Sequence, residues 1–165
     1  MKHTVYFVLL ALSLLWCAGI ILPAVIADSH PLAATSVHLL YRPVCHQRAD
    51  RSLSVHDHPF SVCERCSAIY FSTMLLVFLY PFRKRLHLPF GISLRTLLIF
   101  LLPLLLDRLL AIANLAHNTM ETRLLTGVLA GIGIGLFVLP AWMEAGCQYT
   151  RTNRISLLHN HGGRT

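Results

Sequence analysis

The sequence has little charge and lacks the motifs of soluble enzymes. Charged residues make up only 13% of its 165 residues, whereas soluble domains carry about 25%. It contains no recognisable nucleotide-binding loop, Ser/His/Asp arrangement or nucleic-acid-binding module, so nucleic acid is not an expected partner. The C-x-x-C-H motif of covalent haem attachment is also absent, because Ser67 follows Cys66. It has no internal repeat, low-complexity tract or second soluble domain.

Long apolar runs take the place of the missing charge. Hydrophobic residues make up 55% of the chain, and four runs reach or approach the roughly 20 residues that a membrane-spanning helix needs. We therefore predict an all-α protein, an integral membrane four-helix bundle forming a single domain over 1–165. The expected helices cover about 5–27, 62–82, 96–116 and 124–143. The first run exceeds the ~7–15 apolar residues of a signal peptide, so we expect it to be a retained membrane helix.

The remaining segments are polar. Residues 28–61 form a histidine-rich loop with a short interfacial helix expected at 37–41, and 144–165 form a basic tail expected to be mobile. Lys and Arg are densest at 83–85, which predicts cytoplasmic termini and an extracytoplasmic loop in a plasma (inner) membrane. We read the net charge of +7 as topology and contact with anionic membrane lipid.

A cysteine and histidine cluster lies where the polar loop meets the second helix. Thiolate and imidazole groups suit Zn²⁺. We therefore predict a zinc site formed by Cys45, His46, Cys63 and Cys66, with His56 or His58 as an alternative fourth ligand. Cys17 lies in an apolar run and Cys147 in the tail, and both are expected to be small filler residues or free thiols.

Two other functions fit the same residues. In a membrane thiol–disulfide oxidoreductase without a metal, Cys63 and Cys66 would have thiol pKa values lowered by a helix N-terminus and Arg65, and Cys45 would be the partner thiol. The chain is broadly similar to membrane oxidoreductases that pass electrons to quinone, although those use two cysteine pairs. The third possibility is a small accessory or lipid-binding subunit of a larger membrane complex. Its phosphate or anionic headgroup ligand would contact four arginines, Arg48, Arg51, Arg65 and Arg123.

Two further polar side chains lie inside apolar runs. Tyr70 shares a helix face with Cys63 and Cys66 and lies about 10 Å below Cys63. Asp107 lies about 13 Å below the expected outer end of its helix at 116. A charge at that depth costs at least ~2.5 kcal/mol, so we expect Asp107 to face the bundle interior with a partner. Arg123 or Tyr70 is the expected partner, since adjacent Arg108 points about 100° away.

Glycines recur on the last helix at every fourth position. Gly127, Gly131 and Gly135 form this row, and Gly133 lies beside it. Such a pattern lets a neighbouring helix approach closely, so we expect bulky side chains there to break the bundle.

Several short motifs appear in one order over residues 38–135. They are Cys45-His46-Gln47, Arg51-Ser52, Cys63-x-Arg65-Cys66 with Ile69-Tyr70, Pro103-x-x-x-Asp107 and Arg123-x-x-Thr126-Gly127. This order resembles a family of small prokaryotic membrane proteins of unknown function with a CHQ…RS…CxRCxxIY pattern. The chain departs from the pattern at Arg108, where a small residue is expected. The resemblance supports the choice of site residues and implies no activity.

Overall fold

The protein is described here from a computed structural model, which covers residues 2–82, 87, 89–115 and 119–162. Side chains are described for 3–82, 87, 89–115, 119–145 and 148, so Cys147 and the basic residues at 83–85 lie outside this account. The chain is mostly helical, which confirms the predicted class. The helices are α1 (Lys2–Ile26), α2 (Pro31–Leu40), α3 (Glu64–Leu79), α4 (Leu94–Ile112) and α5 (Met120–Gly162).

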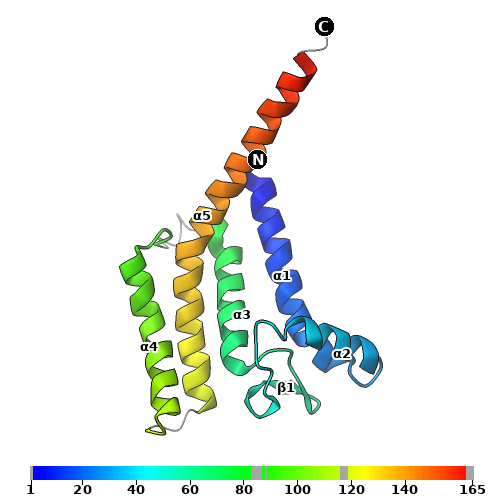
Figure 1. The fold of residues 1–165 in the computed structure, drawn as a ribbon, viewed down its shortest axis with the longest axis vertical. Coiled ribbons are helices and arrows are strands. Elements are labelled where there is room, and N and C mark those ends of the chain that lie inside the picture. Colours follow the sequence, from blue (N-terminus) through cyan, green and yellow to red (C-terminus); the bar gives the residue numbers. More distant parts are fainter. Residues whose placement is uncertain (1, 83–86, 88, 116–118, 163–165) are drawn as a thin grey trace.

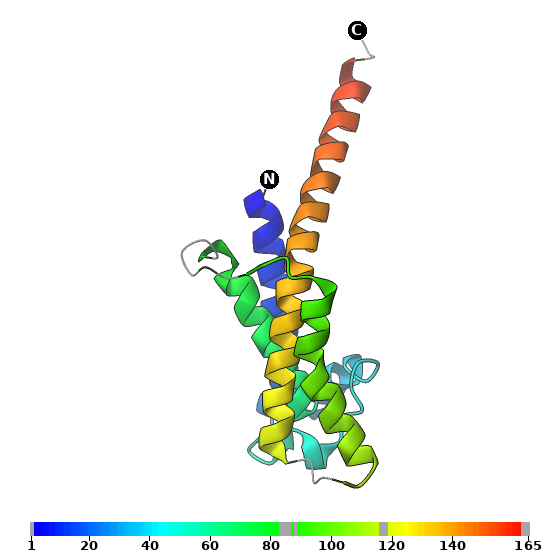
Figure 2. The same cartoon turned by 90° about the vertical axis from the view of Figure 1, so that its left-hand side faces the viewer.

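The helices lie side by side, with the polar loop at one end. In Figure 1, α4, α5, α3 and α1 form a row of roughly aligned helices, and α2 lies across the end of α1. Figure 2, turned by 90°, shows α4 lying along α5, and shows the loop at the end of the molecule where α4 ends and α5 begins. This arrangement places the Cys/His loop beside the start of α3, the end of α4 and the start of α5.

In the part of the chain that the structure describes, three helices are long and apolar enough to cross a membrane. They are His3–Ile26, Glu64–Phe82 and Met120–Ala145; the second consists of α3 and the 3-10 helix η2 (Tyr80–Phe82). The expected span at 96–116 is the helix α4, which ends at Ile112 and carries Arg95, Asp107 and Arg108 within its 19 residues. Three charges within 19 residues distinguish α4 from the three candidate membrane spans.

Two predicted helix boundaries were wrong. The last helix, expected to end at 143, continues as α5 through the basic tail as far as Gly162. Gly146 is the only helix-breaking residue between Pro140 and that end, so helix formation can propagate along the tail. The interfacial helix expected at 37–41 begins earlier, because Pro31 occupies the first helical position, where its missing N–H costs nothing.

The loop also contains a small hairpin. Strands β1 (Ser54–Val55) and β2 (His58–Pro59) pair antiparallel, after the 3-10 helix η1 (Ala49–Arg51). The two connecting residues, His56 and Asp57, have φ values of 48° and 65°. Positive φ at both central positions is the geometry of a tight two-residue hairpin turn.

Prolines inside two helices create docking points for other segments. Pro23 has no N–H, which leaves the Gly19 carbonyl without its usual helical donor. The hydroxyl of Ser61 donates to that carbonyl at 3.4 Å, and the Ser61 N–H donates to the Ile20 carbonyl at 3.0 Å. In α5, Pro140 frees the carbonyl of Leu136 in the same way, and Gly91 N–H donates to it at 2.9 Å. The loop is thus fixed to α1, and the segment before α4 is fixed to α5.

The glycine row packs against α3, as predicted. A Cβ on Gly127 would lie 2.6 Å from the Arg65 carbonyl oxygen, and one on Gly135 would lie 2.6 Å from Leu76 Cδ1. A Cβ on Gly131 would overlap Ser72 Oγ. Gly133 faces the other way, toward Phe100 of α4. Small residues therefore let α5 approach both neighbouring helices.

Candidate metal centre and arginine-lined cavity

Gln47 holds the loop segment that carries Cys45. Its side-chain amide donates to the carbonyl of His38 and, at 2.8 Å, to the carbonyl of Ser61. Gln47 has a φ of 51°, and its backbone N–H donates to the sulfur of Cys45. The end of α2 and the segment before α3 are thereby tied together, and Cys45 is buried between them.

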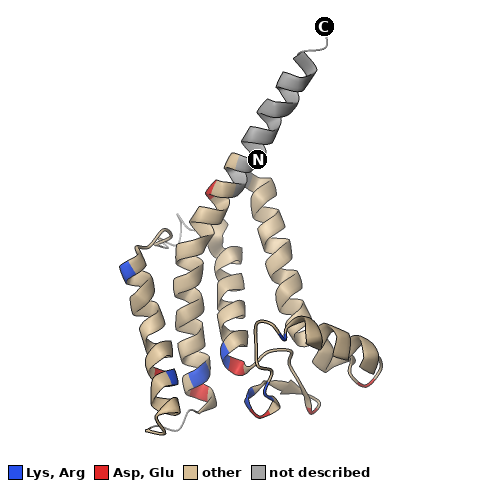
Figure 3. Cartoon of the chain, in the orientation of Figure 1, with Lys and Arg blue, Asp and Glu red and all other residues tan. Residues whose placement is uncertain are grey.

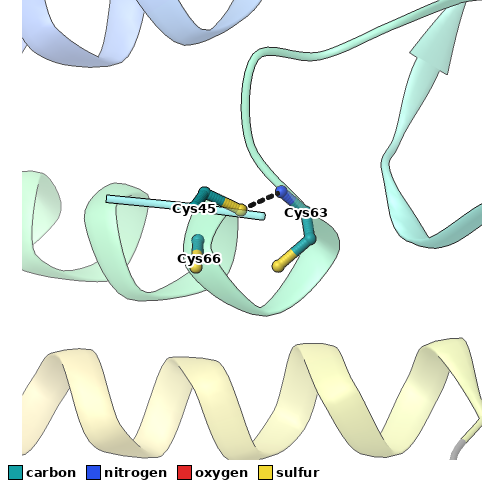
Figure 4. A group of neighbouring side chains, drawn as sticks. All are labelled: Cys45, Cys63 and Cys66. Carbon is teal, nitrogen blue, oxygen red and sulfur yellow. Dashed lines mark hydrogen bonds between the residues drawn. The ribbon is translucent and has the colours of Figure 1, made fainter. Parts of the chain in front are cut away.

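Three cysteines meet at the start of α3. Cys63 caps this helix and Cys66 lies in its first turn, while Cys45 comes from the loop. All three sulfur atoms lie within 4.8 Å of one another. Figure 4 shows their side chains, with the sulfur of Cys45 accepting a hydrogen bond from the Cys63 backbone N–H at 3.2 Å. The Gln47 N–H lies 3.5 Å from the same sulfur.

These hydrogen bonds stabilise negative charge on Cys45. Donation from the Cys63 thiol, then from the Cys66 thiol, and from the two backbone N–H groups lowers the pKa of the Cys45 thiol, although burial opposes the shift. The sequence placed the lowered thiol pKa on the C-x-x-C pair, whereas the structure supports it for the loop cysteine. A thiolate is the form of cysteine that binds metals and attacks disulfides.

The sulfur positions fit a tetrahedral metal. Zn–S bonds of about 2.3 Å in tetrahedral geometry separate two sulfurs by about 3.8 Å, and the observed group lies within 4.8 Å. Small side-chain rotations would close the difference. Backbone N–H groups pointing at a ligating sulfur are the kind of outer contacts that orient metal ligands. The three cysteines could therefore hold one metal ion.

His46 is the predicted ligand that the structure does not bring into this group. It is exposed and lies outside the set of sulfur atoms within 4.8 Å. Its neighbours Cys45 and Gln47 turn inward, and the backbone directs His46 toward the adjoining cavity, which it lines. The alternative ligands His56 and His58 form part of the hairpin, and His58 Nε2 lies 2.8 Å from Asp28 Oδ1.

A cavity of about 530 Å³ adjoins the cysteines. Its lining combines the cluster with basic side chains from the loop, α3, α4 and α5. The lining residues are Val44, Cys45, His46, Gln47, Arg48, Arg51, Cys63, Arg65, Cys66, Arg108 and Arg123. Figure 3 shows that charged residues of α3, α4 and α5 gather at this end of the helices.

Carboxylates behind the cavity wall hold four of these arginines. Arg65 forms an ion pair with Asp107, and their side chains are only 12% and 16% exposed. Arg123 donates to Glu64 at 2.8 Å, with side chains 16% and 9% exposed. In the loop, Asp50 Oδ2 lies 3.0 Å from Arg48 Nη2 and 3.6 Å from Arg51 Nε. The ion pairs fix the directions of the guanidinium groups.

The structure corrects the expected surroundings of Asp107. It has an interior partner as predicted, and the structure pairs it with Arg65, which was not among the expected partners. Because α4 ends at Ile112, Asp107 lies about 8 Å from the helix end instead of about 13 Å. The charge is therefore nearer the end of its helix than the sequence suggested.

Tyr70 lies in an aromatic cluster on the α1 side and not among the cavity-lining residues. Its ring centroid is 5.7 Å from that of Trp16, which in turn packs 4.8 Å from Tyr41. Its backbone carbonyl accepts from the Cys17 thiol at 3.7 Å. Tyr70 supports the core beneath the cysteines, and Cys17 is a buried packing residue, as expected.

Three site residues were missed or undervalued in the sequence. Arg108 lines the cavity, Gln47 organises the loop, and Glu64 holds Arg123. Gln47 stood in a recognised motif, and its position two residues after a cysteine is a signal for an N–H to sulfur contact. No pattern in the sequence would have placed Arg108 or Glu64 correctly, because their positions depend on how the helices are rotated.

Comparison with known proteins identifies the family. Residues 45–137, more than half of the chain, match the family described as "Predicted membrane protein (DUF2085)". The chain belongs to this family. The matched segment begins at Cys45 and contains every residue of the cysteine cluster and every arginine of the cavity.

Two archaeal relatives agree with this assignment. An uncharacterized protein of Methanocaldococcus jannaschii is 32% identical over 109 residues, which cover 66% of this chain and 69% of that protein. An uncharacterized protein of Methanothermobacter thermautotrophicus is 31% identical over 103 residues, which cover 61% of this chain and 88% of that protein. No solved structure matches the chain. The family is thus one of membrane proteins whose function has to be inferred from the site.

Proposed function

We propose that this protein is a multi-pass membrane protein whose Cys45, Cys63 and Cys66 bind one zinc ion at the membrane interface. The observation that carries the proposal is the convergence of three sulfur atoms within 4.8 Å. Three thiolates favour a soft or borderline metal such as zinc over magnesium or calcium. The backbone N–H donors at Cys45 supply the charge stabilisation that a thiolate ligand needs.

Three protein ligands leave the fourth position of a tetrahedral zinc open. Structural zinc sites are normally closed by four protein ligands, whereas catalytic sites keep one position for water or substrate. Because the cysteines line a cavity, the open position would face a space that a ligand can enter. We therefore favour a functional zinc centre over one that only fastens the loop.

We further propose that α4 also crosses the membrane, giving four passes. The chain leaves α3 at the end opposite the cysteines and begins α5 beside them, so α4 connects the two ends (Figure 1). Its 19 residues span about 28 Å, close to the ~30 Å hydrocarbon core. The Lys/Arg bias then supports cytoplasmic termini, a plasma membrane location and a cysteine cluster on the outer side.

Metal content per chain tests the zinc proposal. The protein is purified without chelator, and metals are measured by mass spectrometry. We expect about one zinc per chain in the wild type and much less in Cys45→Ser and Cys63→Ser. Cys17→Ser is the matched control, because Cys17 is buried on α1 and lies outside the cluster. Wild-type protein without metal, or equal metal in all variants, would refute the proposal.

A thiol–disulfide oxidoreductase is the second candidate, supported by the lowered pKa of the Cys45 thiol beside two further cysteines. In such an enzyme, the Cys45 thiolate would attack a disulfide that involves Cys63 or Cys66. Thiol counting on the metal-analysis sample separates the two candidates. Three protected thiols with bound zinc support the metal centre. A reducible disulfide without metal supports the redox function, and quinone reduction is then the assay to perform.

A further inference from the structure

The cavity beside the cysteines is lined by a set of positive charges from separate parts of the chain. Among the residues that the structure describes, five arginines contribute to its wall and no carboxylate does. They come from the loop, α3, α4 and α5, namely Arg48, Arg51, Arg65, Arg108 and Arg123. Convergence of like charges from four segments is unfavourable unless a ligand or counter-charge offsets the repulsion.

Among the described side chains, the carboxylates that pair with these arginines are fewer than the arginines. Three carboxylates pair with them, on Asp50, Glu64 and Asp107. A thiolate on Cys45 raises the negative charges to four, against five guanidinium groups. The cavity therefore keeps an excess of positive charge, and its arginines are held in place before any ligand arrives.

Arg108 is the cavity arginine best suited to a ligand. It is exposed, it lines the cavity from α4, and no acidic partner is found for it among the residues whose side chains are described. Arg108 adds one positive charge to a site where the related sequence pattern is expected to have a small residue. Its charge is thus directed at the cavity rather than used in an internal ion pair.

We propose that this cavity binds a phosphate group. A carboxylate is satisfied by one arginine fork, whereas the oxygens of a phosphate accept from several guanidinium groups in different directions. The volume of about 530 Å³ lies within the ~300–1,000 Å³ of small-molecule sites, so it has room for more than the phosphate. This inference goes beyond the zinc centre and does not depend on it.

The phosphate can belong to a lipid headgroup or to a soluble compound. Apolar surface adjoins the cavity, since the lining residue Val44 is 44% exposed, and Leu40, four positions earlier at the end of α2, is 72% exposed. Such surface fits the acyl chains of a lipid at the membrane interface. Phosphatidic acid and inorganic phosphate share the headgroup chemistry and serve as probes for the two sources.

Binding to Arg108 variants of the full chain tests the proposal. Purified protein in detergent is titrated with inorganic phosphate, and separately with phosphatidic acid in mixed micelles against phosphatidylcholine, all at one ionic strength. Arg108→Ala should weaken binding of at least one phosphate probe by about tenfold or more, because a charge-assisted hydrogen bond is lost. Arg108→Lys should bind with intermediate affinity, because it keeps the charge but not the fork.

Arg95→Ala is the matched control. Arg95 is also exposed on α4 but lies 13 positions, about 20 Å, from Arg108. Tighter binding of phosphatidic acid identifies a lipid ligand, and tighter binding of inorganic phosphate identifies a soluble one. The proposal fails if neither probe binds the wild type, or if Arg108→Ala and Arg95→Ala bind like the wild type. Unchanged melting temperatures of both Arg108 variants would show that the effect is not misfolding.

Discussion

The contact between α3 and α5 is built differently in the middle of the helices and at the end near the cysteines. Along the middle of the helices, Gly131 and Gly135 lie directly against Ser72 and Leu76, and the contact is formed by close packing. At the end near the cysteines, Glu64 and Arg123 join the same two helices by an ion pair. Within a bilayer, small residues and close packing hold helices together, because lipid is as apolar as the side chains.

The difference shows why the chemistry is concentrated at one end. Charged groups are costly in the hydrocarbon core and are tolerated when they are paired near the interface. The cysteine cluster and the arginine-lined cavity lie at one end of the helices, whereas the middle stretches of α1 and α3 and residues 124–143 of α5 carry no Lys, Arg, Asp or Glu (Figure 3). The packed half provides a rigid base, and the polar half can hold groups that would not be stable deeper in the membrane.

A bulky residue in the packed half should have the largest effect. Gly131→Leu would push a side chain into Ser72 Oγ and the backbone of Ile69, neither of which can move away easily. We expect the loss of folded protein, since overpacking alone costs about 1–3 kcal/mol and a backbone overlap costs more. Yield and thermal unfolding in detergent measure this. Val128→Leu on the same helix, at a 37% exposed position, should be tolerated; equal stability of both variants would contradict the packing account.

Breaking one ion pair in the polar half should have a smaller but clear effect. Asp107→Leu leaves Arg65 with its guanidinium largely buried and without this carboxylate, which should cost about 3–5 kcal/mol. The double variant Arg65→Leu/Asp107→Leu should recover part of that loss, because no uncompensated charge remains at the pair. A double-mutant cycle of unfolding free energies measures the coupling, and strictly additive effects would show that the pair is unimportant.

Removing the amide that fixes the loop should cost less again. Gln47→Ala loses the hydrogen bonds to the carbonyls of His38 and Ser61, and Ser61 is fully buried. We expect a loss of about 1–3 kcal/mol in unfolding free energy. Gln47→Asn is the control for backbone conformation, because asparagine tolerates positive φ but is too short to make both contacts. If Asn restored wild-type stability, the backbone and not the hydrogen bonds would be responsible.

Removing the histidine at the cysteine cluster should have the smallest effect. His46 is exposed and lies outside the sulfur group, so His46→Ala should keep the wild-type zinc content. The measurement is metal per chain, beside Cys63→Ser as the variant that loses metal. A loss in His46→Ala as large as in Cys63→Ser would show that the Cys₃His set expected from the sequence is right after all.

Local patterns in the sequence predicted much of the architecture. The apolar runs indicated a helical membrane protein, and the four-residue spacing of Gly127, Gly131 and Gly135 predicted the close helix contact that the structure shows. Of the four predicted metal ligands, Cys63 and Cys66 meet because they are one helical turn apart, and the loop brings Cys45 to them. The end of α4 and the helical continuation of α5 were predicted wrongly, because helix boundaries depend on contacts and propagation that a hydropathy pattern does not contain.

The sequence by itself determined that this protein is a helical membrane protein with a thiol cluster beside a helix start, because these features follow from residue type and spacing along the chain. Only the tertiary structure decided that Arg65 pairs with Asp107, that Arg108 lines the cavity and that His46 lies outside the sulfur group. These outcomes depend on the rotation of each helix about its axis and on the path of the loop. Both are fixed by contacts between residues far apart in sequence, such as Gln47 with Ser61 and Gly127 with Arg65.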